Sequence, residues 1–218
     1  MWNPLIIFTT ALTFILSLAL GIYTLSINPR EKINKLWFLS NLAVALWTFS
    51  YILLFLTTDD KTAAFLQNFL YTGAILIPIF LFHFVVLFTY QKGRFILLFG
   101  YLYSSILIIL LYTTDLLLKG TFVNRDFFDE IRGPLFPFYL LYFFLFIILS
   151  VIFLIKKYLK ADGIYKKQIL YILIAILISA IGGSTNYITE IYDIYPYGQT
   201  FVFLYPIIIT YALFLKKY

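Results

Sequence analysis

The chain has 218 residues, of which 63% are hydrophobic and only 12% are charged, and its formal net charge is +6. Soluble domains carry roughly 25% charged residues, so a water-soluble fold of this composition is excluded. The chain has no cysteine and one histidine, which excludes disulfides, thiolate catalysis and a metal cluster built on these residues. The composition therefore indicates an integral membrane protein.

Charged residues divide the chain into seven uncharged apolar runs, each long enough to cross a bilayer. A hydrocarbon core about 30 Å thick needs about 20 apolar residues in a helix, and a spanning segment must satisfy its own backbone hydrogen bonds. We expect helices at residues 5–27, 36–57, 63–90, 95–113, 137–156, 168–189 and 198–215. The sequence therefore predicts an all-α fold, a polytopic bundle of seven transmembrane helices that forms a single domain over residues 1–218.

The distribution of basic residues predicts the orientation of this bundle. When the seven helices alternate, twelve of the sixteen Lys and Arg residues fall on one side of the membrane. Eight of the ten acidic residues fall on the other side. Because basic loops stay in the cytoplasm, we expect the N-terminus outside and the C-terminus in the cytoplasm. The net positive charge is thereby explained by membrane topology, and a nucleic-acid partner is not expected.

One connection is longer than the rest, the outer segment 115–137. It contains Phe122, Phe127, Phe128 and the acidic pair Asp129 and Glu130. Its length suits a short helix lying at the membrane interface or a lid over the mouth of the bundle. It is too short for a separate sensory domain.

Polar side chains recur on one face of the expected helix 63–90. Asn68, Thr72 and His83 lie at helical spacing, and Pro78 between them is expected to kink the helix. These residues are candidates for ligand contact, with Pro78 as a candidate for signal relay. His83 has two interpretations, a hydrogen-bonding residue inside the bundle or a proton sensor.

A second set of candidates lies near the outer ends of the last two helices. Asn186 is either a hydrogen-bond partner between helices or a ligand contact. Glu190 and Tyr197 belong either to a solvated loop or to the rim of a ligand site. Pro206 is expected to kink the seventh helix and is the second candidate for signal relay.

Apart from Lys156 at the end of the expected helix 137–156, the seven expected helices contain no Asp, Glu, Lys or Arg. A proton or cation transporter usually places a carboxylate in mid-membrane, and a retinal protein needs a lysine in its last helix. No paired carboxylates and no serine–histidine motif support an enzyme mechanism. A small transporter or channel subunit nevertheless stays as the alternative to a receptor.

Several short motifs give the chain a family resemblance. Their order and spacing are similar to the N-terminal seven-transmembrane sensor region of bacterial and archaeal histidine kinases. The motifs are Asn28-Pro29-Arg30, Tyr71-Thr72-Gly73 followed by Pro78, Lys167-Gln168-Ile169-Leu170-Tyr171, Gly182-Gly183 with Asn186-Tyr187, and Tyr195-Pro196-Tyr197-Gly198.

The resemblance implies a receptor in the cell membrane that detects a small or lipid-like ligand. Such a ligand would enter between the third, sixth and seventh helices, beneath segment 115–137. The seventh helix would relay a shift to a cytoplasmic output domain or a partner kinase, and a homodimer is expected. The sequence ends at Tyr218 with no phosphoacceptor helix or ATP lid, so we expect no enzyme activity and no cofactor from these residues.

Overall fold

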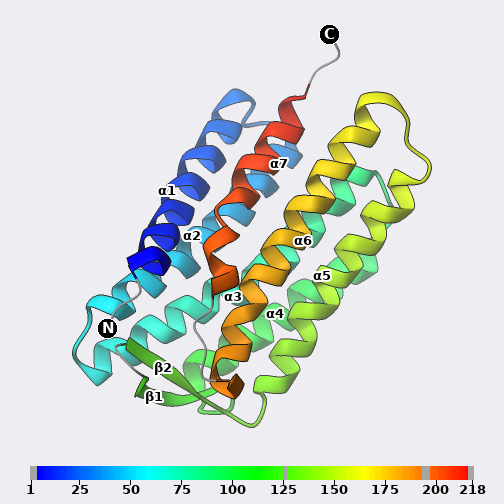
Figure 1. Ribbon diagram of the computed structural model, residues 1–218. Helices are drawn as coiled ribbons and strands as arrows, with labels where there is room; N and C mark the ends of the chain where they lie inside the picture. The colour runs from blue at the N-terminus through cyan, green and yellow to red at the C-terminus, as the bar shows by residue number, and fades with distance from the viewer. Residues whose placement is uncertain (1–3, 125–126, 193–196, 216–218) are drawn as a thin grey trace.

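The computed structural model describes residues 4–124, 127–192 and 197–215, leaving aside the side chains of 124, 127 and 188–192. In this described part a bundle of α-helices carries a two-stranded sheet at one end (Figure 1). The elements are α1 (Pro4–Ile27), α2 (Lys32–Leu56), α3 (Asp60–Thr89), α4 (Arg94–Thr113), β1 (Leu118–Asn124), β2 (Phe127–Arg132), α5 (Phe136–Tyr158), α6 (Gly163–Tyr192), η1 (Tyr197–Phe201) and α7 (Leu204–Phe214). Seven segments are long and apolar enough to cross a membrane, and the last combines η1 with α7. The predicted seven-transmembrane-helix bundle is confirmed.

Helix α3 is the central element of the bundle. It packs against α2, α4, α5 and both strands, while α7 lies against α1 and α6. The close approach of α2 and α3 depends on Gly73, because a Cβ there would lie 2.7 Å from the backbone oxygen of Ala43 and the backbone nitrogen of Trp47. Small residues allow such approaches between membrane helices, which increases van der Waals contact.

The two prolines proposed for signal relay occupy different positions in their helices. Pro78 lies in the interior of α3 and is buried, so it removes one N–H donor from the helical ladder. Pro206 lies in the first turn of α7, where backbone N–H groups have no partner within the helix. The seventh span is interrupted just before Pro206, between η1 and α7.

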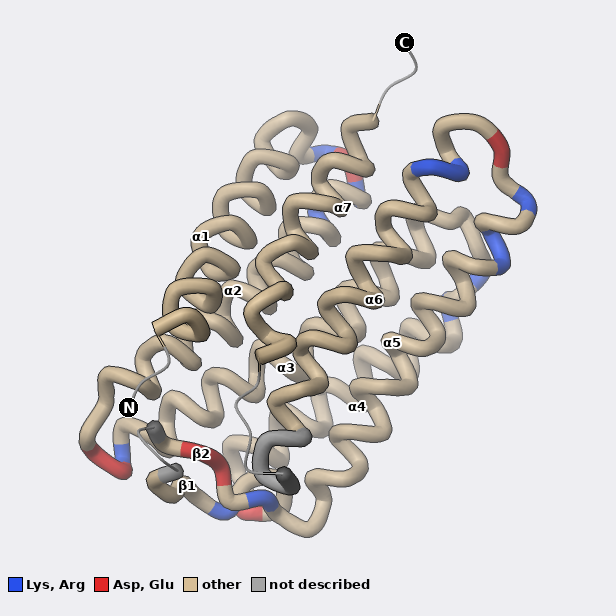
Figure 2. Tube along the Cα trace, in the orientation of Figure 1, with Lys and Arg blue, Asp and Glu red and all other residues tan. Residues whose placement is uncertain are grey.

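Charged residues mark the two ends of the bundle (Figure 2). Lys and Arg gather at the end where α2, α4 and α6 begin, and Asp and Glu are more frequent at the end that carries the sheet. Helix α3 begins at the sheet end with a capping residue, Asp59, whose carboxylate accepts the backbone N–H groups of Lys61 and Thr62. The charge asymmetry found in the sequence is thus an asymmetry between the ends of the folded bundle.

Segment 115–137 forms a β-hairpin, so the expected short interfacial helix is wrong in the described residues. Strands β1 and β2 pair antiparallel, with Thr121 opposite Glu130. β-Branched and aromatic residues favour strands, which explains why this segment pairs instead of coiling. The hairpin lies across the ends of α2 and α3, with which it makes contact (Figure 1).

Candidate functional site

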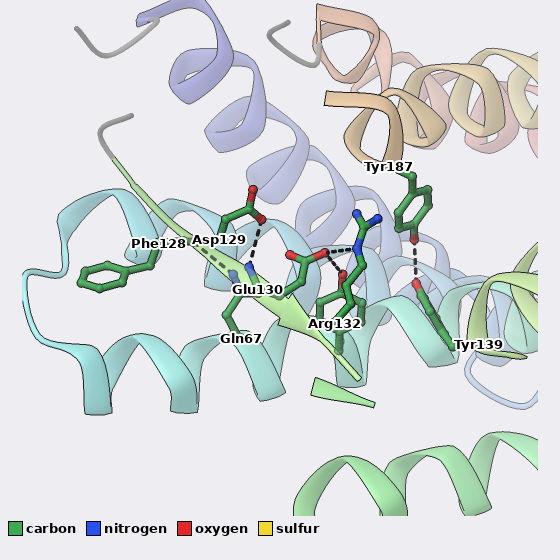
Figure 3. A network of polar contacts seen from close by, with 8 residues as sticks. Gln67, Phe128, Asp129, Glu130, Arg132, Tyr139 and Tyr187 are labelled. Carbon is green, nitrogen blue, oxygen red and sulfur yellow. Dashed lines mark hydrogen bonds and ion pairs between the residues drawn. The ribbon is translucent and has the colours of Figure 1, made fainter. Parts of the chain in front are cut away.

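A polar network joins strand β2 to the N-terminal half of α3 (Figure 3). Glu130 is its centre, and the side chain of Glu130 is only 10% exposed. The Tyr71 hydroxyl donates a hydrogen bond of 2.5 Å to Glu130 Oε1, and Arg132 Nε donates to the same oxygen at 3.4 Å. One carboxylate oxygen thus connects the hairpin with the central helix.

One further hydrogen bond joins β2 to α3, and another lies within the strand itself. The buried side chain of Gln67 on α3 donates from Nε2 to the backbone oxygen of Phe128 at 3.0 Å. The backbone N–H of Glu130 donates to Oδ1 of Asp129, also at 3.0 Å, and Asp129 itself is only 8% exposed. The sheet end of the bundle therefore buries two adjacent acidic residues.

Aromatic rings surround this network. The Tyr71 ring packs edge-on against Tyr139 and Phe136, with centroids 5.4 and 5.7 Å apart. The Arg132 guanidinium lies 4.6 Å from the centroid of the Phe136 ring, a cation–π contact. The Tyr139 and Tyr187 hydroxyls are hydrogen-bonded at 2.7 Å (Figure 3). The network thus reaches from β2 through α3 and α5 to α6.

The surroundings of Glu130 change its protonation. Burial, followed by the negative charge of Asp129, raises the pKa of Glu130 to about 8. The hydrogen bond from Tyr71 and the charge of Arg132 act in the opposite direction and offset only part of this rise. Burial beside Asp129 therefore favours the protonated form of Glu130.

A groove lies beside the network, between α3, α4 and β1. Its volume is about 390 Å³, within the range of pockets that bind small molecules. Its lining is Ala64, Gln67, Asn68, Leu111, Tyr112, Thr113, Thr114, Asp115, Leu118, Lys119 and Gly120. Amide, hydroxyl, carboxylate and ammonium groups in this set suit a small ligand with hydrogen-bonding groups.

With this geometry established, the chain can be compared with known proteins. Residues 9–216 match a family model described as the N-terminal 7TM region of histidine kinase. The chain belongs to this family. No curated protein sequence matches it. The family predicted from the sequence is confirmed, and the chain is a multi-pass protein of the cell membrane in a histidine kinase context. Such a 7TM region is not itself the catalytic part of a histidine kinase.

Three candidate residues of this 7TM region lie on the face of α3 that meets α4. Asn68 lines the groove. Thr72 Oγ1 lies 3.0 Å from the Tyr112 hydroxyl, and His83 Nδ1 lies 2.7 Å from the Tyr101 hydroxyl. Asn68 therefore lines a groove in the described part of the chain, while His83 contacts Tyr101 across the α3–α4 interface.

The candidates near the ends of α6 and α7 lie apart from the groove. Asn186 Nδ2 donates to the backbone oxygen of Gly183 on its own helix, at 3.1 Å. Tyr197 begins η1 and is exposed. The side chain of Glu190 lies outside the described residues. The groove lies between α3, α4 and β1, whereas the ligand site expected from the sequence lay between the third, sixth and seventh helices.

The central residues of the network were not among the sequence candidates. Tyr71, Glu130 and Arg132 come from segments about sixty residues apart, and a single sequence gives no sign that they meet. Glu130 and Arg132 lie on one face of β2, and Ile131 lies on the other face and is 42% exposed. Alternation in the sequence favours burial of the apolar residue, so it does not predict that Glu130 points into the protein.

Proposed function

We propose that this 7TM region is a membrane-embedded sensor whose hairpin end receives a stimulus and whose opposite end passes the change to cytoplasmic signalling domains. The observation that carries the proposal is the buried Tyr71–Glu130–Arg132 network, because it joins the hairpin to the central helix. A buried polar network with two arrangements can act as a switch, since each arrangement favours one packing of the helices.

The proposal includes the orientation of the helical bundle in the membrane. Lys and Arg gather at the end opposite the hairpin, and basic loops remain in the cytoplasm (Figure 2). The hairpin would then face the outside of the cell. The chain has no cysteine, so single cysteines can report this directly. A membrane-impermeant maleimide added to whole cells should label Lys119→Cys on the hairpin and should not label Lys92→Cys at the opposite end.

The ligand belongs to the proposal as well. The groove beside Asn68 is walled by β1, so ligand binding and hairpin position depend on each other. We infer that a small molecule with hydrogen-bonding groups binds there and favours one position of the hairpin. The energy available to the switch is limited to the difference in ligand affinity between the two states.

Contacts along α6 and α7 support a relay toward the other end. The Tyr139–Tyr187 hydrogen bond links the neighbourhood of the hairpin to α6. A Cβ on Gly182 would lie 2.4 Å from the backbone oxygen of Gly198, so α6 and η1 are in backbone contact. Near the cytoplasmic end, Gln168 Nε2 donates to the backbone oxygen of Ala212 on α7 at 2.9 Å. A change at Tyr187 would therefore reach α7 through α6.

A chimaera tests the sensor function. Residues 1–215 would be joined to the dimerisation and catalytic domains of a histidine kinase, and autophosphorylation measured in membrane vesicles. Tyr71→Phe should change the level of phosphorylation, whereas the control Tyr103→Phe, which removes a long hydrogen bond of 3.4 Å between α4 and α5, should not. Equal phosphorylation in the unsubstituted chimaera and in its Tyr71→Phe and Tyr103→Phe variants would contradict the sensor function. Ion flux across liposomes that contain the 7TM region would also contradict it.

A further inference from the structure

Five buried polar side chains on α1, α2 and the seventh span have no hydrogen-bond partner among the described residues. They are Ser17 on α1, Ser40 and Asn41 on α2, Gln199 on η1 and Tyr205 on α7, and each is at most 3% exposed. The atoms without a partner are the three hydroxyl oxygens and the amide oxygens of Asn41 and Gln199. Buried polar groups in proteins are nearly always hydrogen-bonded, so five such groups on adjoining helices need an explanation. We refer to these five side chains as the polar seam.

Contacts with α1 form one side of the polar seam. Helix α1 lies beside α2 and beside the seventh span (Figure 1). Gln199 Nε2 donates to Thr10 Oγ1 at 3.1 Å, so the Gln199 amide group points at α1. A Cβ on Gly21 would lie 3.0 Å from the Cβ of Asn41, so Asn41 also lies against α1, one helical turn from Ser17.

Trp37 on α2 forms the other side of the polar seam. Its ring lies 5.2 Å from the Tyr205 ring, centroid to centroid, and its Nε1 donates to Thr210 Oγ1 at 3.1 Å. The backbone oxygen of Trp37 accepts from Asn41 Nδ2 at 2.8 Å, and Ser40 lies about one turn further along the same helix. The five groups therefore belong to one interior region between α1, α2 and the seventh span.

The hydroxyls of the polar seam differ from other buried hydroxyls on the same two helices. Thr13 on α1 donates to the backbone oxygen of Thr9 at 2.7 Å, and Ser50 on α2 donates to that of Leu46 at 2.9 Å. This bond to the preceding turn is the usual one for Ser and Thr inside a helix. Within the described residues Ser17 and Ser40 do not make it. Their hydroxyls are thus directed away from the backbone of their own helix.

Water is the ligand whose chemistry fits all five groups. The amide oxygens of Asn41 and Gln199 can only accept hydrogen bonds, whereas the three hydroxyls can also donate. A cation would satisfy acceptors alone, and the sequences of α1, α2 and residues 197–214 contain no Asp or Glu to balance its charge. A buried water molecule donates and accepts, and it typically makes about three hydrogen bonds to polar groups of the protein.

The interruption of the seventh span points to the same occupant. Regular helix is broken between η1 and α7, and this break lies between Gln199 and Tyr205, two members of the polar seam. Non-helical backbone occurs at membrane depth only where it is buried in protein or lines a cavity that holds water. Polar side chains and non-helical backbone thus lie in the same part of the bundle.

We propose that ordered water molecules bind along the polar seam and supply the hydrogen-bond partners of its five side chains. The inference goes beyond the proposed sensor function, and it involves none of the residues of the hairpin network. Hydrogen bonds through water are nearly as favourable as direct ones, and a water molecule can exchange one partner for another. The hydrated seam lets the seventh span shift against α1 while its polar groups stay hydrogen-bonded.

X-ray footprinting of the 218-residue chain in lipid nanodiscs tests the inference. Hydroxyl radicals formed from water bound inside a protein oxidise the neighbouring side chain, and mass spectrometry locates the product. Tyr205 and Tyr142 are a matched pair, because each is 3% exposed and the Tyr142 hydroxyl donates to the backbone oxygen of Ile75 at 3.1 Å. We expect Tyr205 to be oxidised several times faster than Tyr142. Equal rates at the two residues would overturn the proposal.

Removal of the same two hydroxyls gives an independent measurement. If the Tyr205 hydroxyl is bonded to water, Tyr205→Phe should lower the midpoint of thermal unfolding by about 1–6 °C, as the control Tyr142→Phe should. If the hydroxyl has no partner at all, its burial is a cost to the folded state, and its removal raises the midpoint. A raised or unchanged midpoint in Tyr205→Phe overturns the proposal. Oxidation of Tyr205 that requires sodium in the buffer also overturns it, because the occupant would then be a cation.

Discussion

Tyr71→Phe tests the central contact of the network. The substitution removes one hydroxyl and keeps the ring, which packs edge-on against Tyr139 and Phe136. Glu130 would retain the contact from Arg132 at 3.4 Å, which is long for a hydrogen bond. Losing a hydrogen bond to a charged group costs about 1.5–3 kcal/mol, and losing one to a neutral group costs about 0.5–1.5 kcal/mol. The equilibrium constant for docking of the hairpin on the helical bundle should therefore fall roughly 10- to 150-fold when Glu130 is ionised. The fall should be smaller when Glu130 is protonated.

Hydrogen exchange measures this weakening. The amides of β1 and β2 should exchange faster in Tyr71→Phe than in the unsubstituted protein, and the difference should be larger at pH 9 than at pH 5 after correction for the intrinsic rate. The amides of α5 should be unaffected. Tyr103→Phe is the matched control, since it also removes one tyrosine hydroxyl, outside both the network and the groove. Equal hairpin exchange in the two variants would refute the role given to Tyr71.

Two further predictions concern the packing of the bundle and use the midpoint of thermal unfolding in detergent. Gly73→Ala should destabilise the protein by about 1–3 kcal/mol, because its Cβ would meet the backbone of α2 at 2.7 Å. A Cβ on Gly183 would meet no atom within 4 Å, so Gly183→Ala should be neutral or stabilising by up to about 1 kcal/mol. A loss of stability as large as that of Gly73→Ala would contradict the packing described for these two glycines. Thr210→Val should cost about 1 kcal/mol because it removes the 3.1 Å hydrogen bond from Trp37 Nε1 that joins α2 to α7. Thr48→Val should cost less, because in the described part of the chain the Thr48 hydroxyl donates to backbone oxygens of its own helix.

The bundle could be predicted from the sequence because its helices are defined by composition alone. An uncharged apolar run longer than 20 residues has few alternatives to a spanning helix, since lipid offers no hydrogen-bond partners to the backbone. The charged residues that separate these runs likewise predict the two ends of the bundle. The argument from composition fails for the seventh span, where a 3-10 turn over Tyr197–Phe201 precedes α7, because overall hydropathy does not distinguish these backbone forms.

The hairpin and its network could not be predicted in the same way. Segment 115–137 has no long apolar run, and its length alone allows a helix, a lid or a hairpin. Glu130 has the sequence context of a solvated loop residue, and only the fold places it against Tyr71. His83 attracted attention as the single histidine of the chain, yet its partner is Tyr101 in a helix interface.

The central claim is that the hairpin end is coupled to the opposite end of the bundle, and one distance tests it most directly. Spin labels at Arg30→Cys and Lys167→Cys, both exposed positions at the end opposite the hairpin, would report on the arrangement of α2 and α6 in nanodiscs. The account predicts that Tyr71→Phe shifts this distance distribution at pH 9 and that Tyr103→Phe leaves it unchanged. The contradicting result is the same distance distribution in the unsubstituted protein, Tyr71→Phe and Tyr103→Phe while hydrogen exchange of the hairpin amides is faster in Tyr71→Phe. The hairpin would then open without any effect at the other end of the bundle.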